Sequence, residues 1–103
     1  MIVFRIEVLA NDNNWYGLFS SRWAGVNYLE LEDFRESVRY KHNPSPWIYN
    51  DLKYRHYFKK EFMKRIDIPY DTKIRWHRKY IDKKDIVWED ETQVVLDTNE
   101  ITK

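Results

Sequence analysis

The alternation of apolar and polar residues predicts a strand near the start of the chain. Residues 2–9 are mostly apolar and are interrupted by Arg5 and Glu7, a pattern typical of a buried or half-buried strand. The aromatic stretch 15–29 indicates a second short strand or an ordered loop. We therefore expect the N-terminal third of the chain to contribute to a sheet.

The last third of the chain also shows strand periodicity. Residues 72–81 contain no glycine or proline, and their two sides differ in character: Ile74, Trp76 and Tyr80 against Arg75, His77 and Lys79. Two shorter apolar runs, 86–88 and 93–96, flank an acidic turn at 89–91. Three more strands are expected here, which fits a small, mainly antiparallel sheet.

A four-residue spacing of large apolar side chains predicts the principal helix, over residues 46–66. Its buried stripe and its opposite face are Tyr54, Phe58, Phe62 and Ile66 against Lys53, His56, Lys60 and Lys64. The Ser-Pro pair at 45–46 suits a helix N-terminus, and the Asn-Asp pair at 50–51 is an alternative start. A shorter helix is expected over residues 31–40.

Length and composition fit a single α+β domain over residues 1–103. Hydrophobic residues make up 43% of the chain and aromatic residues 17%, which is enough for a compact core. The absence of cysteine excludes a disulfide scaffold, a thiolate metal site and a cysteine nucleophile. The first segment is too short and too charged for a signal peptide or a membrane span. We therefore expect a cytoplasmic protein that makes no membrane contact.

The net charge of +1 hides a strong internal asymmetry. The first 34 residues have a net charge of −3, and residues 85–103 have a net charge of −5. Between them, residues 35–84 have a net charge of +9. A basic middle between acidic ends points to a surface for an acidic partner.

The basic middle supplies the candidate binding residues. If the outer face of the principal helix lies beside the strand at 72–81, their basic side chains form one patch with two aromatic anchors: Lys53, Lys60, Lys64, Arg75, Arg78, Trp47 and Tyr57. Such a patch suits an acidic protein through charge complementarity. It also suits single-stranded nucleic acid, since cations bind phosphates and rings stack on bases. A solvated helix face that keeps the domain soluble is the third interpretation.

Motifs for catalysis or cofactor binding are missing from the sequence. The three histidines, at positions 42, 56 and 77, lack the spacing of a metal site, and we expect no metal. Two glycines cannot form a phosphate-binding loop, and no serine stands in a nucleophile motif. The residues therefore favour a binding protein without a cofactor over an enzyme.

Several short elements resemble a loose group of small phage and prophage proteins. They are the opening Val-Phe-Arg-Ile-Glu at 3–7, a His-x-Pro-x-Pro segment at 42–46 ahead of Asp51, an aromatic helix, and a closing Gln-Val-Val-Leu strand at 93–96. The resemblance implies a bacteriophage accessory protein that binds and occludes a host or phage macromolecule in the host cytoplasm. A host or phage protein is the expected partner, and nucleic acid is the alternative.

A second resemblance is to ADP-ribosyltransferase-like folds. Arg5 in the first strand, Ser21 in the next element and Gln93 before a late apolar strand occur in the matching order. This resemblance implies a nucleotide pocket built around these three residues. Gln93 stands where the family has a catalytic glutamate, and an amide cannot stabilise a cationic transition state. The resemblance therefore implies a nucleotide-binding protein without transferase activity.

Overall fold

The computed structural model describes residues 1–20, 23, 27–69, 71–97 and 100–102. It confirms the α+β fold and the mainly antiparallel sheet expected from the sequence. The strands are β1 (Ile2–Leu9), β2 (Trp15–Gly17), β3 (Trp47–Tyr49), β4 (Ile74–Tyr80), β5 (Ile86–Glu89), β6 (Gln93–Leu96) and β7 (Ile101–Thr102). The helices are α1 (Tyr28–Ser37), α2 (Leu52–Arg65) and the short 3-10 helix η1 (Lys83–Asp85).

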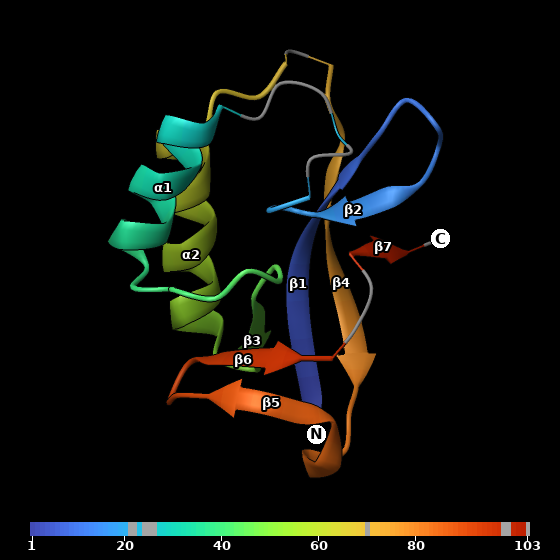
Figure 1. Ribbon diagram of the computed structural model, residues 1–103, viewed down its shortest axis with the longest axis vertical. Helices are drawn as coiled ribbons and strands as arrows, with labels where there is room; N and C mark the ends of the chain where they lie inside the picture. The colour runs from blue at the N-terminus through green and yellow to red at the C-terminus, as the bar shows by residue number, and fades with distance from the viewer. Residues whose placement is uncertain (21–22, 24–26, 70, 98–99, 103) are drawn as a thin grey trace.

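The sheet is organised around β1, which is paired on both of its edges (Figure 1). One edge pairs with β4 along seven consecutive residues. The other edge is shared, because β3 pairs with the first half of β1 and β2 with the second half. Further from β1, β6 pairs with β3 and β5 pairs with β6, whereas β7 pairs with β2. All the described pairs are antiparallel, and β4 pairs with β1 alone among the described strands.

The register gives the sheet two buried faces of different character. Ile6 and Val8 of β1 face the helices, whereas Val3, Arg5 and Glu7 face the other way. The helix-side core combines strand and helix residues, including Ile6, Val8, Leu18, Leu31, Phe34, Val38, Ile48, Phe58, Phe62 and Val95. The opposite face has a smaller apolar cluster of Val3, Trp47, Ile81, Val94 and Leu96. Charged residues are therefore buried on the face that the helices leave uncovered.

Helix α2 begins six residues later than the predicted start at residue 46. The Asp51 side chain accepts a hydrogen bond from the Tyr54 amide at 3.1 Å and caps the helix, so the alternative start at 50–51 is confirmed. Residues 47–49 form β3 instead, because pairing with β1 and β6 satisfies their backbone groups. The predicted stripe is confirmed, since Phe58, Phe62 and Ile66 are buried.

Helix α1 lies three residues earlier than the predicted range 31–40. The Asn27 side chain accepts hydrogen bonds from the amides of Leu29 and Glu30, which defines the N-terminus. After Ser37 the chain leaves the helix, and Arg39 adopts a φ of 56°, in the left-handed region. The capping side chain and this turn together explain the shift.

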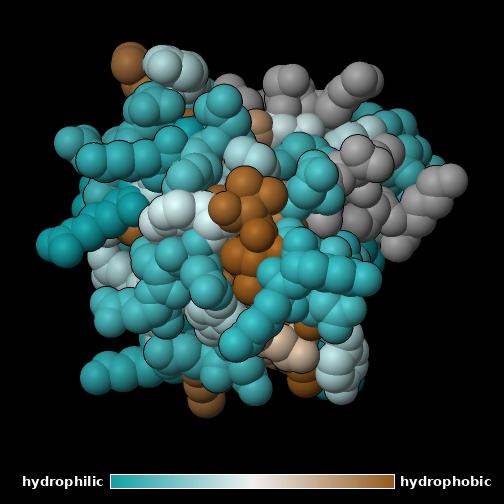
Figure 2. Space-filling model, turned by 60° about the horizontal axis from the view of Figure 1, so that its bottom comes forward, coloured by the Kyte–Doolittle hydropathy of each residue, from teal (hydrophilic) through white to brown (hydrophobic). Residues whose placement is uncertain are grey.

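The surface seen from the end with β5 and the N-terminus is mainly hydrophilic, with one compact hydrophobic area near its middle (Figure 2). Among the described residues, none of the helices combines the length and the apolar character needed to cross a membrane.

Candidate functional site

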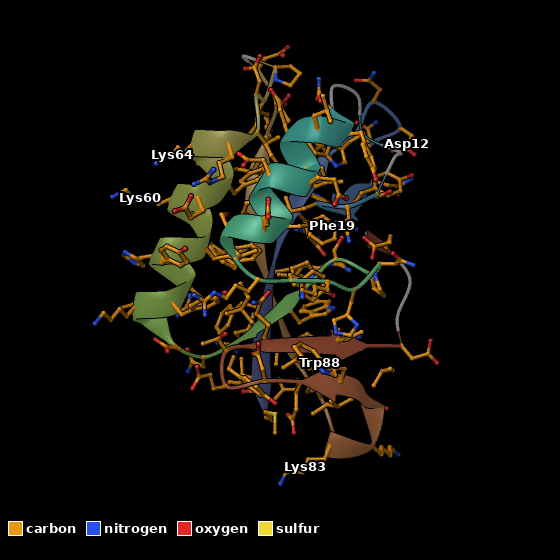
Figure 3. The ribbon with its side chains drawn as sticks, turned by 60° about the vertical axis from the view of Figure 1, so that its left-hand side comes forward. Asp12, Phe19, Lys60, Lys64, Lys83 and Trp88 are labelled. Atoms are coloured by element: carbon orange, nitrogen blue, oxygen red, sulfur yellow. The ribbon has the colours of Figure 1, made fainter. Side chains whose placement is uncertain are left out.

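The outer face of α2 carries the predicted basic residues in exposed positions. Lys53, Lys60 and Lys64 are exposed, and none of them forms an ion pair within the described part of the chain. Figure 3 shows Lys60 and Lys64 pointing away from the sheet. Tyr57 is 42% exposed and donates a hydrogen bond from its hydroxyl to the Ser37 carbonyl at 2.9 Å, which holds the ring beside α1. These residues form an accessible basic surface.

A groove of about 410 Å³ separates α2 from β4. Its lining residues are Arg55, His56, Lys59, Lys60, Met63 and Trp76. The Arg55 guanidinium lies 4.0 Å from the centre of the Phe4 ring and 5.9 Å from that of Trp76, so a cation is held against the aromatic floor. None of the lining residues is acidic. The groove therefore combines apolar contact surface with positive charge.

The strand beside this groove has an unpaired edge. The Leu9 amide donates to the Lys73 carbonyl and the Ile81 amide donates to the Met1 carbonyl, so odd-numbered residues of this segment point their backbone groups toward β1. The alternate residues point theirs outward: Ile74, Trp76, Arg78 and Tyr80. No described residue pairs with these outward groups. They are available to another polypeptide strand.

Two of the predicted binding residues are not part of the α2 surface. Arg78 is exposed on the helix side of β4, but Arg75 lies on the opposite side of the sheet, opposite Glu7 of β1. Trp47 is only 2% exposed, because β3 lies inside the sheet and turns the indole into the smaller apolar cluster. The prediction of one patch with Trp47 as an exposed anchor is therefore wrong. Strand alternation separates Arg75 from Arg78.

The face opposite the helices carries a buried carboxylate with three basic partners. Glu7 is 0% exposed and accepts hydrogen bonds from Arg5 Nη2 at 2.7 Å and from Arg75 Nε at 2.9 Å. His77 Nδ1 lies 3.0 Å from the same carboxylate. Burial raises the pKa of Glu7, but the hydrogen bonds from Arg5, His77 and Arg75 outweigh burial and lower it below its usual range. Glu7 is therefore held ionised.

Trp47 lies at the centre of the remaining groups on this face. The Arg5 guanidinium carbon lies 4.6 Å from the centre of the indole, and Lys79 Nζ lies 5.5 Å from it. The ring centres of Trp47 and His77 are 5.6 Å apart in an edge-to-face arrangement. The buried indole therefore gives the neighbouring cations an aromatic surface, which stabilises them away from water.

The nucleotide pocket predicted from Arg5, Ser21 and Gln93 is not assembled by the described residues. Arg5 lies on the face opposite the helices, whereas the Gln93 side chain lies on the helix side and donates to the Val38 carbonyl at 2.8 Å. Ser21 lies outside the described residues. Two of the three residues are thus separated by the thickness of the sheet.

Sequence reasoning missed the roles of Glu7 and His77. Alternation predicted that both lie on the polar sides of their strands, and His77 was otherwise considered only as a metal ligand. Their contact depends on the register of β1 against β4, which places Arg5 opposite His77 and Glu7 opposite Arg75. An acidic residue in one predicted strand and basic residues in another are the sequence signal that could have indicated an ion pair across the sheet.

The described residues form no other candidate site with as many specific contacts as these two. Within the described ranges, no group of three or more His, Asp or Glu side chains is arranged to hold a metal ion. A hollow beside α1 is lined by residues of both charges, among them Glu32 and Arg35, which form a contact of 3.8 Å. No protein-family model, curated protein or solved structure matches the chain. The basic surface beside β4 and the cluster around Glu7 are therefore the two candidate sites of the described residues.

Proposed function

We propose that this protein binds an extended, acidic segment of a partner protein along β4. The observation that carries the proposal is the unpaired edge of β4 beside the basic groove at α2. An incoming strand would pair with the outward backbone groups of β4, and its alternate side chains would enter the groove. This combination supplies affinity through the backbone and selectivity through the groove.

A polypeptide fits this surface better than a nucleic acid does. The outward edge of β4 presents both N–H donors and C=O acceptors. A polypeptide strand matches both kinds of group, whereas phosphate oxygens only accept hydrogen bonds. The carbonyl groups of Trp76 and Arg78 would stay unpaired against a phosphate backbone. The edge therefore favours the protein partner over the nucleic-acid alternative.

The charge of the surface selects an acidic segment. Arg78 is exposed on the edge strand, and Lys59 and Lys60 line the groove. Acidic side chains on the partner would complement these cations, most strongly at low ionic strength. A second copy of β4 would bring like charges together, which disfavours self-pairing. The bacteriophage origin and the accessory, occluding role remain predictions from the sequence, since neither the fold nor the comparisons bear on them.

The test uses a fluorescent ten-residue peptide of alternating Glu and Val, measured by anisotropy. We expect binding that weakens with salt and that falls about tenfold in the double variant Lys60→Ala/Arg78→Ala. Lys83→Ala is the matched control, because Lys83 is exposed at the far end of the molecule on η1 (Figure 3).

Three further probes separate the interpretations. A peptide with alternate amides N-methylated keeps its charge but cannot pair along one edge, so it should bind more weakly. A peptide with Lys in place of Glu should not bind. A single-stranded DNA oligonucleotide that binds more tightly than the Glu-Val peptide would overturn the proposal in favour of nucleic acid. An equal loss of affinity in the double variant and in Lys83→Ala would mean that the peptide binds through non-specific electrostatic attraction, and the proposed site would be wrong.

A further inference from the structure

We propose a second binding site, for a small phosphate monoester, on the opposite face of the sheet around Trp47 and Lys79. The site is independent of the β4 edge, because it uses side chains that point away from α2. It combines buried donors with a cavity on the same face, and Lys79 lies between them. The proposal starts from buried N–H groups that have no acceptor.

Two buried donors on this face are unsatisfied. Arg5 Nη1 and Trp47 Nε1 are both buried, and neither has a hydrogen-bond partner among the described residues. The two side chains are in contact, with the Arg5 guanidinium stacked on the indole. A buried N–H without an acceptor costs about 1–3 kcal/mol, so such groups in a folded protein usually bind water or a ligand. The two unsatisfied N–H groups therefore indicate that an acceptor binds near Trp47.

One side chain of β4, Lys79, adds to this donor group, and His77 lies beside it on the same face. Glu7 is ionised and only accepts, so His77 Nδ1 carries the proton of their contact and the ring is fixed in orientation. His77 is 29% exposed, and with the proton on Nδ1 its Nε2 is an acceptor, so this ring donates nothing to the ligand. Lys79, two residues further on the same face, forms no ion pair within the described part of the chain. Its ammonium is free to bind an anion.

Two carboxylates on this side of the sheet, those of Glu7 and Glu100, already have other partners. Glu7 is occupied by Arg5, Arg75 and His77. Glu100 accepts from the Ser45 amide at 2.7 Å and from the Ser45 hydroxyl. The acceptor that we propose for these donors is an external oxyanion. A phosphate monoester has three terminal oxygens and up to two negative charges, which suits several donors and a lysine better than the two oxygens of a carboxylate do.

A cavity of about 410 Å³ on the same face has room for the rest of such a ligand, and Lys79 connects it to the donors, because Lys79 lines the cavity and its Nζ lies 5.5 Å from the centre of the Trp47 ring. The apolar floor of the cavity belongs to the same cluster as Trp47. The complete lining is Lys79, Ile81, Lys84, Asp85, Val87, Leu96 and Asp97. The two aspartates would repel a bare anion, but they suit the hydroxyl or amino groups of a sugar phosphate or a nucleotide. The phosphate would lie at the Lys79 end.

Calorimetric titration with three probes tests the site: inorganic phosphate, glucose 6-phosphate and 5′-AMP. We expect at least one of the two esters to bind more tightly than inorganic phosphate, and whichever ester does so identifies the class of ligand. Lys79→Gln should lower the affinity for that ester about tenfold. Lys83→Gln, on an exposed lysine outside the cavity lining, should leave it unchanged.

Trp47→Phe provides the second variant, since it keeps an aromatic ring and removes the unsatisfied N–H. This variant should also bind the ester more weakly. Its midpoint of thermal unfolding shows whether the fold is kept. The proposal is overturned if none of the three probes binds at millimolar concentration, or if Lys79→Gln and Lys83→Gln weaken binding equally. Preferential binding of inorganic phosphate alone would contradict the assignment of the cavity.

Discussion

The two groups of positive charge in this protein differ in what holds them. On the face opposite the helices, Arg5 and Arg75 are bonded to one carboxylate and lie against tryptophan rings. On α2, Lys60 and Lys64 extend into solvent with no ion pair among the described residues (Figure 3). The buried group is tied to the stability of the sheet, whereas the exposed group is available to a partner. Net charge alone does not distinguish these roles.

The strongest test of this difference is the removal of the central carboxylate. Glu7→Gln leaves the cations around a neutral amide, with Arg5 only 1% exposed. Breaking a buried ion pair in this way typically costs about 3–5 kcal/mol. Urea unfolding should therefore show a large loss in the free energy of unfolding. Glu91→Gln, at an exposed turn position, is the matched control and should stay within about 0.5 kcal/mol of the parent protein.

The same carboxylate predicts a pH dependence that the exposed lysines do not share. Because the pKa of Glu7 is lower in the folded protein than in the unfolded chain, its stabilising contribution is complete above the unfolded value. That contribution is lost as the pH falls below about 4.5 and through the folded value. The stability difference between the parent and Glu7→Gln should shrink on acidification. A difference that stays constant from pH 7 to pH 3 would rule out this linkage.

A third variant tests where α2, the helix that carries the exposed lysines, begins. Asp51→Ala removes the side chain that caps the Tyr54 amide, and loss of an N-cap costs about 1 kcal/mol. Thermal unfolding should register that loss. Ser45→Ala would act as the cap variant if the helix began at residue 46, but here it removes a hydroxyl that donates to Glu100 and accepts from the Phe19 amide. Unchanged stability in Asp51→Ala would contradict the observed boundary.

The smallest effect is expected at the exposed lysines. Lys60→Ala and Lys64→Ala remove solvated side chains that form no ion pair with any described residue, so each should change the free energy of unfolding by less than about 0.5 kcal/mol. Chemical denaturation of the two variants checks this expectation. A loss comparable with that of Glu7→Gln would mean that the exposed group is structural, and the contrast between the two groups would fail.

Local sequence patterns predicted those parts of the fold that depend on local periodicity. The spacing of Phe58, Phe62 and Ile66 predicted the buried face of α2, and alternation predicted the two sides of β4. The burial of Trp47 was missed, because residues 47–49 become a strand only through pairing with β1 and β6. Such pairing is non-local, and a local pattern carries no information about it.

The candidate site was predicted only in part for the same reason. The exposed lysines follow from the position of α2's outer face, which the helical period reveals. The groove and the unpaired edge require the position of α2 relative to β4, and the cluster around Glu7 requires the register of β1 against β4. Opposed charges on two distant strands become a contact only when the whole sheet is assembled.

The pairing of β1 with β4 also has a consequence for the order of folding. Glu7 and His77 are in contact although they stand 70 positions apart in the sequence. During synthesis the ribosome adds about 5–20 residues per second, so β1 waits for several seconds before β4 exists. Closing so large a loop is slow compared with forming a helix. We expect the charges of Arg5 and Glu7 to limit aggregation of this apolar strand in the nascent chain, before the same residues stabilise the assembled sheet.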